Sequence, residues 1–401
     1  MRLAGGLGRL TYCQNIHPAE SWAEARAALL GPTRAVKAAL SPDAPFTVGL
    51  RLSAQAVRDL AAPPAQAALI RLLAEEGYEA ATVNGFPYGP SHGAPVKQAV
   101  YRPDWRDPAR LDYTCALAAL MARIAPQGET ATLSTVPGGF AADCAGDEAA
   151  VADGLLQAAA HCARLAQETG ATVALAVEPE PRCLMQTTAG AIDFFARWLF
   201  DARAVRRMAD LAGLSTTAAA AALPRHLGLC FDVCHAAVEF EDIPASLAAL
   251  RAAGVPAHKM QLSAALRVAR ADAQARAALS AFAEPVYLHQ VTARRGDGAL
   301  LRFDDLPGAL AAAEGATPGS PDGAEWRVHF HVPVFTDVAG PFSTTQDALA
   351  AALAIHRAQP VTPHLEVETY TWGVLPEALR GGPVEAAVTR EMRWVLARLA
   401  P

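Results

Sequence analysis

The chain has 401 residues, of which 52% are hydrophobic and 18% are charged, and its formal net charge is -6. This apolar content is enough for a large buried core and excludes an intrinsically disordered chain. The negative balance argues against binding driven by phosphate neutralisation, so we expect no nucleic-acid partner. Seven cysteines without a CxxC pair fit a reducing compartment. Because no uncharged apolar run reaches the ~18 residues of a membrane span, we expect a cytoplasmic protein.

Short β-branched or aromatic runs alternate along the chain with longer runs rich in Ala and Leu. Strands are predicted at residues 9–16, 46–52, 80–86, 130–136, 172–177, 227–233, 259–263 and 364–370. Helical spacing is found between them, for example at residues 17–30, 65–76, 109–124 and 148–168. Several helices are expected to end at a glycine with positive φ, namely Gly31, Gly77, Gly170 and Gly254.

Eight strands that alternate with helices predict parallel β-α units, because parallel neighbours need crossover connections. Such units can close into an α/β fold of the (β/α)8 TIM barrel type, which leaves no exposed sheet edge. An open doubly wound sheet is less favoured, since no GxGxxG follows the first strand. We therefore expect a single domain over residues 1–401. An elaborated rim segment is expected at about 280–345, with strand-like runs at 286–291 and 327–335 around a loop at 316–324.

Polar side chains follow most of the predicted strands, where a barrel would gather them at one rim. These residues are Asn15, His17, Asn84, Glu178, Glu180, Asp232, His235, Lys259, Gln261, Glu366 and Glu368, joined by His289, His329 and His331 from the inserted segment. Buried carboxylates and imidazoles are costly unless they are paired, protonated or bound to a metal. Asp, Glu and His without a thiolate cluster predict a divalent ion: Mn²⁺, Mg²⁺, Co²⁺ or Zn²⁺.

Simpler interpretations stay open for several of these residues. Glu180 and Glu366 are also compatible with ion-paired rim positions, and His235 with an ordinary helix start. Alternation puts His329 and His331 on one side of a strand; one of them is compatible with a solvent-facing position, and His331 is preferred as the inward one. The remaining histidines are interpreted as surface or core residues: His92, His161, His226, His258 and His356.

Two short motifs resemble the xylose isomerase-like barrel superfamily. They are EPEP at residues 178–181 and D-x-x-H at residues 232–235, and the strand with Glu368 fits as well. The shared site of that superfamily takes Glu from strand five, Asp from strand six, a ligand from strand seven or its following loop, and Glu from strand eight. The resemblance thus implies metal ligation by Glu178, Asp232 and Glu368.

Longer phrases across the chain resemble the EboE family of metabolite traffic proteins, which belongs to these barrels. They include LTYCQNIHPAESW, TVNGFPYGPSHG, LSTVPGGF, AVEPEPRCL, CFDVCHAAVEFED, HFHVPVF and HLEVETYTW. The resemblance implies a role in bacterial secondary-metabolite handling and a functional link to other proteins of one gene cluster. Two departures from xylose isomerases matter. Glu180 replaces the lysine of EPKP, and strand seven offers Gln261 where many relatives have a metal-binding histidine.

The resulting hypothesis is a divalent-metal-dependent isomerase or epimerase of a sugar, cyclitol or related polyol. The metal ligands would be Glu178, Asp232, Glu368 and a histidine, His331 or His289. Glu178 and Glu368 would exchange a proton with the substrate, with His235 and Lys259 assisting. The substrate-binding residues are assigned as His17, Asn84, Glu180, Gln261 and His289.

Two alternatives stay open. One is a metal-dependent phosphoesterase of the endonuclease IV type, in which the additional histidines and Glu366 support more than one ion. The other is a barrel that binds a metabolite without turning it over. The sequence does not determine the oligomeric state.

Overall fold

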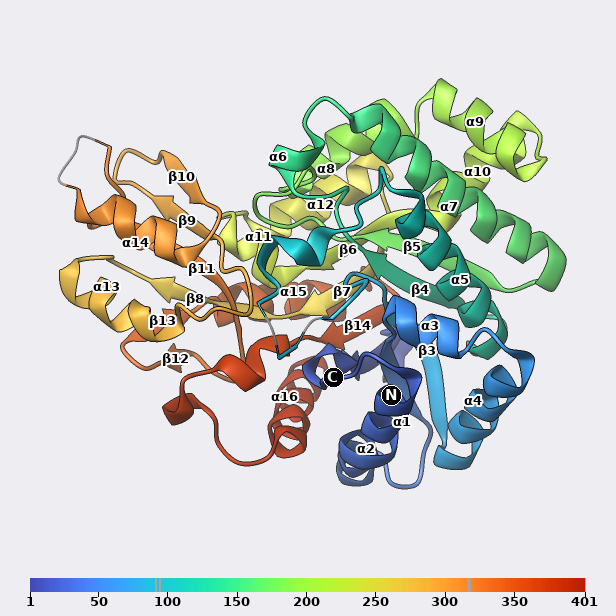
Figure 1. Ribbon diagram of the computed structural model, residues 1–401, viewed down its shortest axis with the longest axis horizontal. Coiled ribbons are helices and arrows are strands. Elements are labelled where there is room, and N and C mark those ends of the chain that lie inside the picture. Colours follow the sequence, from blue (N-terminus) through green and yellow to red (C-terminus); the bar gives the residue numbers. More distant parts are fainter. Residues whose placement is uncertain (91, 94, 316–318, 401) are drawn as a thin grey trace.

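The computed structural model of the protein describes residues 1–90, 92–93, 95–315 and 319–400. Its central feature is a barrel of eight strands, all pairing in parallel, surrounded by helices (Figure 1). The strands are β1 (Arg9–Tyr12), β2 (Phe46–Arg51), β3 (Tyr78–Asn84), β4 (Thr130–Thr135), β5 (Thr172–Val177), β6 (Leu227–Asp232), β7 (Ala257–Leu262) and β14 (His364–Val367).

The order of the strands is β1-β14-β7-β6-β5-β4-β3-β2. A parallel bridge between Cys13 and Gly49 joins the two ends of the sheet and closes the barrel. Gly49 is required at this junction, because a Cβ atom there would overlap the Glu366 carboxylate and lie 2.7 Å from the Tyr12 carbonyl oxygen. The predicted (β/α)8 barrel is thus confirmed, and each of the eight strands overlaps its predicted range. β1 and β14 end earlier than predicted, at Tyr12 and Val367, and the 3-10 segments η2 and η7 occupy the predicted strand residues 14–16 and 370.

The helices cover the outside of the barrel and part of its rim. The α-helices are α1 (Trp22–Ala28), α2 (Arg34–Leu40), α3 (Ala54–Asp59), α4 (Pro63–Glu76), α5 (Pro108–Ile124), α6 (Ala141–Cys144), α7 (Glu148–Thr169), α8 (Thr188–Phe194), α9 (Ala202–Ala212), α10 (Thr216–His226), α11 (Val233–Val238), α12 (Ile243–Ala253), α13 (Ala273–Leu279), α14 (Leu306–Glu314), α15 (Gln346–Ala358) and α16 (Val384–Leu399). The short 3-10 or π segments are η1 (Ala4–Gly6), η2 (Gln14–Ile16), η3 (Leu29–Thr33), η4 (Lys97–Tyr101), η5 (Phe195–Leu199), η6 (Ser280–Phe282), η7 (Tyr370–Val374) and η8 (Glu377–Leu379).

Local chemistry explains where the first helix begins and ends. The prediction placed its start at residue 17, but α1 begins at Trp22, because Ser21 forms a capping box with Glu24. The positive φ expected at Gly31 is wrong: Gly31 lies inside the π segment η3, together with Pro32. The other three glycines do end their helices in the left-handed conformation, with φ of 65°, 75° and 68° at Gly77, Gly170 and Gly254.

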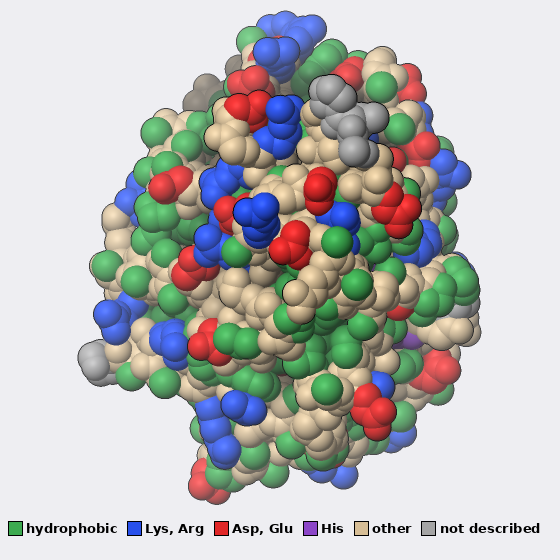
Figure 2. Space-filling view, turned by 90° about the vertical axis from the view of Figure 1, so that its left-hand side faces the viewer, with side chains coloured by type: hydrophobic (Ala, Val, Ile, Leu, Met, Phe, Trp, Pro, Cys, Tyr) green, Lys and Arg blue, Asp and Glu red, His purple; other side chains and the backbone are tan. Residues whose placement is uncertain are grey.

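A second, antiparallel sheet lies beside the barrel, at the left of Figure 1. Its order is β10-β9-β11-β8-β13-β12. The strands are β8 (Ala264–Val268), β9 (Val291–Arg294), β10 (Leu300–Phe303), β11 (Glu325–Val332), β12 (Val338–Ala339) and β13 (Phe342–Thr344). This appended sheet has a hydrophobic cluster of its own, which includes Leu266, Trp326, Phe330 and Phe342. Acidic and basic side chains are interspersed on this side of the molecule (Figure 2).

The appended sheet differs from the expected insertion in two respects. It begins at Ala264, earlier than the boundary expected near residue 280. The strand expected at 286–291 is wrong, since regular pairing starts only at Val291. The amides of Val286 and His289 donate to the carboxylates of Glu284 and Asp305 instead of a neighbouring strand. Of the loop expected at 316–324, residues 316–318 lie outside the described residues.

Within the described residues, no helix combines the length and the apolarity that a crossing of the lipid bilayer requires.

Candidate active site and metal centre

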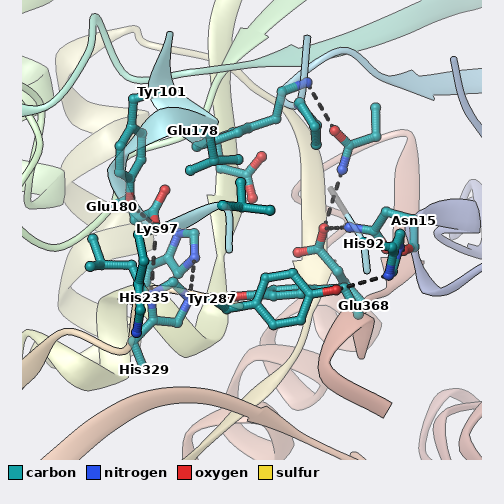
Figure 3. A pocket seen from close by; sticks show the side chains of 17 residues that line it. Asn15, His92, Lys97, Tyr101, Glu178, Glu180, His235, Tyr287, His329 and Glu368 are labelled. Atoms are coloured by element: carbon teal, nitrogen blue, oxygen red, sulfur yellow. Dashed lines mark hydrogen bonds and ion pairs between the residues drawn. The ribbon is translucent and has the colours of Figure 1, made fainter. Parts of the chain in front are cut away.

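A cavity opens at the carboxyl ends of the barrel strands (Figure 3). Its polar lining residues are Asn15, Asn84, His92, Lys97, Glu178, Glu180, His235, His329 and Glu368. The more apolar lining residues are Phe86, Pro87, Val96, Val100, Leu288, Tyr101, Tyr287 and Tyr370. The two kinds are interspersed, since the Tyr101 hydroxyl bonds to Glu180 and the Tyr287 hydroxyl to His92.

Glu178 is held at the end of β5 by backbone pairing, because its amide donates to the Thr135 carbonyl oxygen at 3.0 Å. Its side chain is 2% exposed, and Oε2 has no hydrogen-bond partner among the described residues. Burial and the nearby carboxylates of Glu368 and Asp232 raise the pKa of Glu178 well above its ordinary value. A carboxylate so placed needs a cation or a proton.

Asp232 ends β6 and caps α11. Its Oδ1 accepts hydrogen bonds from the His235 amide at 2.9 Å and from the Ser263 hydroxyl at 2.7 Å. Its Oδ2 is buried without a partner among the described residues. Burial alone would raise the pKa of Asp232, but the imidazoles of His235 and His331 and these two hydrogen bonds lower it. One oxygen is thus fixed by the fold, and the other is free to bind a ligand.

Glu368 follows β14 on the opposite side of the barrel mouth from Glu178 (Figure 3). Its Oε1 accepts hydrogen bonds from Asn15 Nδ2 at 2.7 Å and from Asn84 Nδ2 at 3.2 Å. Burial, with repulsion from Asp232 and Glu366, raises the pKa of Glu368 well above its ordinary value. Asn15 and Asn84 thus orient a carboxylate that carries a high proton affinity.

The three carboxylates converge as the superfamily resemblance predicts. One oxygen from each of Glu178, Asp232 and Glu368 lies within 4.8 Å of the others, and all three side chains are buried. Carboxylate oxygens are preferred ligands of hard divalent cations, and two of these residues carry oxygens without any partner in the described structure. The donor set fits a divalent metal ion.

Both histidines of the HFHVP phrase point into the molecule. His329 is 2% exposed and His331 is fully buried, so the interpretation that one of them faces solvent is wrong. They lie on β11, whose sheet packs against the barrel rim beside His235. Burial lowers the pKa of both rings, to about 4 for His331, so both are neutral at pH 7.

Glu180 belongs to the rim, but within the part of the chain that the structure describes it is not ion-paired with a Lys or Arg. It accepts a hydrogen bond from the Tyr101 hydroxyl at 2.6 Å, and Gln290 Nε2 lies 3.3 Å from the same oxygen. Burial raises the pKa of Glu180, and these donors only partly offset it. The side chain lines the cavity close to His329, whose Nδ1 is 3.5 Å away.

Besides Asp232 and His331, four further predicted site residues lie outside the cavity lining among the described residues. Lys259 is buried inside the barrel in an ion pair with Glu366, and the neighbouring Gln261 is also fully buried. Glu366 is therefore ion-paired below the rim rather than on it. His17 Nε2 bonds to the Tyr12 hydroxyl at 3.0 Å.

The fourth of these residues is His289. Its two ring nitrogens bond to the Glu284 carboxylate at 2.7 Å and to the His329 carbonyl oxygen at 2.8 Å. No described contact brings these four side chains into the cavity, so their proposed catalytic and binding roles stay predictions.

Sequence reasoning missed part of the cavity. His92 was assigned to the surface or the core, yet it lines the cavity and its Nε2 lies 2.6 Å from the Asn15 carbonyl oxygen. The hydroxyl of Tyr287 lies 2.9 Å from His92 Nδ1. Tyr101 and Tyr370 were not considered as site residues. The only signal for His92 was its place in TVNGFPYGPSHG, a phrase that begins in the last three residues of β3 and continues into the following loop.

Solved structures resemble the fold over nearly the whole chain. IolI with a bound zinc atom aligns with a TM-score of 0.47 and 10% identity, covering 98% of this chain and 97% of that one. A xylose isomerase-like TIM barrel protein from Mycobacterium smegmatis in complex with magnesium gives 0.46 and 10%, with coverages of 98% and 96%. The 3-keto-D-glucoside 4-epimerase YcjR from E. coli gives 0.43 and 10%, with coverages of 97% and 99%.

No protein-family model and no curated protein matches the chain. Membership of the EboE family therefore stays a prediction. The eight-stranded parallel barrel rests on the strand pairing described above, independently of these distant similarities.

Proposed function

We propose that this protein is a divalent-metal-dependent isomerase or epimerase of a sugar, cyclitol or related polyol. The observation that carries the proposal is the convergence of Glu178, Asp232 and Glu368 beside the cavity, which Glu178 and Glu368 line. Among the described residues no Lys or Arg is ion-paired with these three buried carboxylates, so they would repel each other. This cost is avoided when they share a cation. Glu178, Asp232 and Glu368 would hold the ion, with His331 as the nitrogen ligand, since ligand atoms of His331 and Asp232 lie within 4.8 Å of one another.

The ion, when bound, would polarise the oxygens of a hydroxy-ketone and lower the pKa of a hydroxyl that it holds. Glu178 and Glu368 lie on different sides of the cavity floor and line it directly (Figure 3). Their positions suit them to accept a proton from a substrate carbon and to return one from the other face. A stereocentre next to a carbonyl would be inverted in this way, or the carbonyl moved by one carbon.

The remaining polar residues favour a small polyol. Asn84 and Glu180 border the cavity, and His235 contributes a ring edge beside them. Such groups can donate hydrogen bonds to, and accept them from, several hydroxyls of one substrate. These hydrogen bonds would hold the substrate in a single orientation. Glu180 in place of a lysine supplies no cation for an open-chain carbonyl, which favours epimerisation over an aldose–ketose hydride shift.

The apolar residues that line the cavity limit the class of substrate further. Phe86, Val100 and the ring of Tyr287 can cover the C–H face of a sugar or cyclitol ring. The resemblance to EboE proteins supports a substrate from secondary metabolism and a functional link to other proteins of one gene cluster. We propose that the substrate is this small molecule and that no nucleic acid takes part in the reaction.

The test is exchange of substrate C–H for C–D in D₂O, measured by NMR with cyclitols and ketoses and with Mn²⁺ or Mg²⁺ present. Exchange by the wild type that falls at least 100-fold in Glu178→Gln would support the proposal, since one acid–base group contributes about 10²–10⁴-fold in rate. Glu129→Gln is the matched control, because Glu129 precedes β4 at the other end of the barrel, in an ion pair with Arg9.

Two results would overturn the proposal. One is tight binding of a polyol without any exchange, which would instead indicate a metabolite carrier. The other is equal exchange in the wild type and Glu178→Gln. Release of phosphate from small phosphoesters with no C–H exchange would favour the hydrolase alternative.

A further inference from the structure

Glu180 is a buried carboxylate with one oxygen held by the fold and one oxygen without a partner. The Tyr101 hydroxyl donates to Oε1 at 2.6 Å, and Gln290 Nε2 lies 3.3 Å from the same oxygen. Among the described residues no hydrogen bond reaches Oε2, although Glu180 is only 5% exposed and lines the cavity. A molecule that enters the cavity therefore meets an acceptor that the protein leaves unsatisfied.

The donors on Oε1 favour the ionised form of this carboxylate. The distance of 2.6 Å from the Tyr101 hydroxyl is typical of an O–H group that donates to a charged oxygen. Gln290 Nε2 donates to the oxygen of that hydroxyl at 2.7 Å, which polarises the O–H group further. The fold thus stabilises an anion at Glu180 and leaves its second oxygen for a ligand.

No Lys or Arg of the protein neutralises this charge within the described part of the chain. Lys97 is the one Lys or Arg among the described residues that line the cavity. Its ammonium group is already ion-paired with Asp305 at 2.7 Å and bonded to the Glu284 carbonyl oxygen at 3.0 Å. The charge of Glu180 therefore has to be matched by something other than a basic side chain.

The two imidazoles beside Glu180 have other partners for their N–H groups (Figure 3). His329 Nδ1 is closer to Gln290 Oε1, at 2.7 Å, than to Glu180 Oε1, at 3.5 Å. His235 Nδ1 lies 2.8 Å from the Pro179 carbonyl oxygen, which only accepts hydrogen bonds, so this nitrogen carries the hydrogen. Because a neutral ring has a single N–H, neither ring has a second hydrogen to donate to Glu180 Oε2.

The cavity stays anionic even when the metal ion of the proposed function is bound. Four carboxylates lie at this end of the barrel, and one divalent ion offsets only two of their charges; they are those of Glu178, Glu180, Asp232 and Glu368. Opposite charges attract each other more strongly in a cavity of low dielectric constant than in water. Such a cavity favours a ligand with a positive charge over a neutral ligand of the same shape.

Aromatic rings complete surroundings that suit an ammonium group. Tyr101, Tyr370 and Phe86 line the same cavity, and the rings of Phe86 and Tyr101 are in edge contact, with centroids 5.9 Å apart. The π electrons of such rings attract cations and offer nothing to an anion such as phosphate. A carboxylate and aromatic rings at one cavity are therefore a combination that binds amines.

We propose that the polyol substrate carries a primary amino group, as in an amino sugar or an aminocyclitol, and that its ammonium group binds Glu180 Oε2. This inference names the substrate class of the proposed function, and it rests on that function for the polyol part alone. A hydroxyl can donate a hydrogen bond to Oε2, but it leaves the charge of a buried carboxylate unmatched. An ammonium group supplies the hydrogen bond and the charge together.

The test compares ligands that differ in this one group, by isothermal titration calorimetry of the full-length protein with Mg²⁺ at about pH 6.5. The pairs are D-glucosamine with D-glucose and scyllo-inosamine with scyllo-inositol. In at least one pair, the wild type should bind the amine at least about 10-fold more tightly than the alcohol, because hydrogen bonds between charged groups are stronger than those of a hydroxyl. N-acetyl-D-glucosamine keeps the nitrogen without its charge and should bind no more tightly than D-glucose.

Glu180→Gln removes the charge but keeps an oxygen that accepts from Tyr101. It should bind the amine and the alcohol of the preferred pair with nearly equal affinity. Glu239→Gln is the matched control and should keep the preference, because Glu239 is also buried but is ion-paired with Arg302 at 2.8 Å and lies outside the cavity lining. If Glu180→Gln fails to fold by circular dichroism, Glu180→Ala replaces it with the same expectation.

Equal affinity for the amine and the alcohol in both pairs would overturn the inference. So would an undiminished preference in folded Glu180→Gln, or the failure of both amines to bind at millimolar concentration. These measurements need no turnover. A preference for the amine without any C–H exchange would overturn the proposed function alone, whereas exchange of neutral polyols without a preference would overturn only this inference.

Discussion

Substituting Glu391 by glutamine should change how the stability of the protein depends on pH. Glu391 lies on α16, is 1% exposed, and its Oε1 accepts hydrogen bonds from the Val334 amide at 3.0 Å and the Thr369 hydroxyl at 2.6 Å. Those two donors follow the segments that carry His331 and Glu368. Burial raises the pKa of Glu391 from 4.5 to about 7, which the two hydrogen bonds only partly offset.

The sign and the size of this change in stability with pH follow from proton linkage. Between pH 4.5 and 7 the folded chain binds the Glu391 proton more tightly than the unfolded chain, so the contribution of this group to stability falls as pH rises. A difference of 2.5 pKa units, at 1.36 kcal/mol each, gives about 3 kcal/mol over that window. Glutamine keeps an oxygen that accepts both hydrogen bonds, and it never ionises. The free energy of unfolding of Glu391→Gln should therefore rise by about this much, relative to that of the wild type, as the pH increases from 4.5 to 8.

The assay is urea unfolding of the two proteins at several pH values, compared as the difference in free energy of unfolding at each pH. Other titrating groups cancel in that difference. Glu377→Gln, at an exposed position, controls for the loss of one negative charge. A difference between wild type and Glu391→Gln that stays constant from pH 4.5 to 8 would refute the reasoning.

Three further outcomes are expected. Gly49→Ala should lower the free energy of unfolding by at least about 1–3 kcal/mol, because its Cβ would overlap the Glu366 carboxylate; Gly31→Ala, whose Cβ meets nothing within 4 Å, should be neutral or stabilising in the same urea assay. Lys259→Met should lower the free energy of unfolding by about 3–5 kcal/mol, because it leaves the buried Glu366 carboxylate unpaired. The double variant Lys259→Met/Glu366→Leu should be more stable than Lys259→Met, and equal or lower stability would contradict this reasoning. Adding Mn²⁺ at 100 times its Kd to stripped protein should raise the free energy of unfolding by about 2.7 kcal/mol, and an unchanged thermal midpoint would count against a metal site.

The barrel was predictable because its signals are local and repeated. The β-branched runs, the glycines after helices and the alternation of elements all indicate the same architecture, and β5 was predicted with both ends correct. A closed barrel then brings the carboxyl ends of distant strands to one rim. Glu178, Asp232 and Glu368 could therefore be placed together from the sequence, although 190 positions separate the first from the last.

The appended sheet was harder to predict because its pairings join segments far apart in the chain. β11 pairs with β8, so Trp326 lies opposite Val268, and nothing in either segment specifies that partner. Alternation correctly put His329 and His331 on one side of their strand, but which way that side faces depends on how the sheet docks. His92 lies in a loop without periodicity, and its contacts with Asn15 and Tyr287 exist only in the folded chain.

The division of the donors between two sheets has a consequence for how the protein can evolve. The carboxylates of Glu178, Asp232 and Glu368 stand at the ends of barrel strands, whereas His329 and His331 belong to β11, a strand with a separate hydrophobic cluster. Mutations that loosen the smaller sheet would displace these imidazoles and leave the carboxylates in place. Sequence drift in the appended sheet can thereby change the groups around the cavity without disturbing the barrel that positions the three carboxylates.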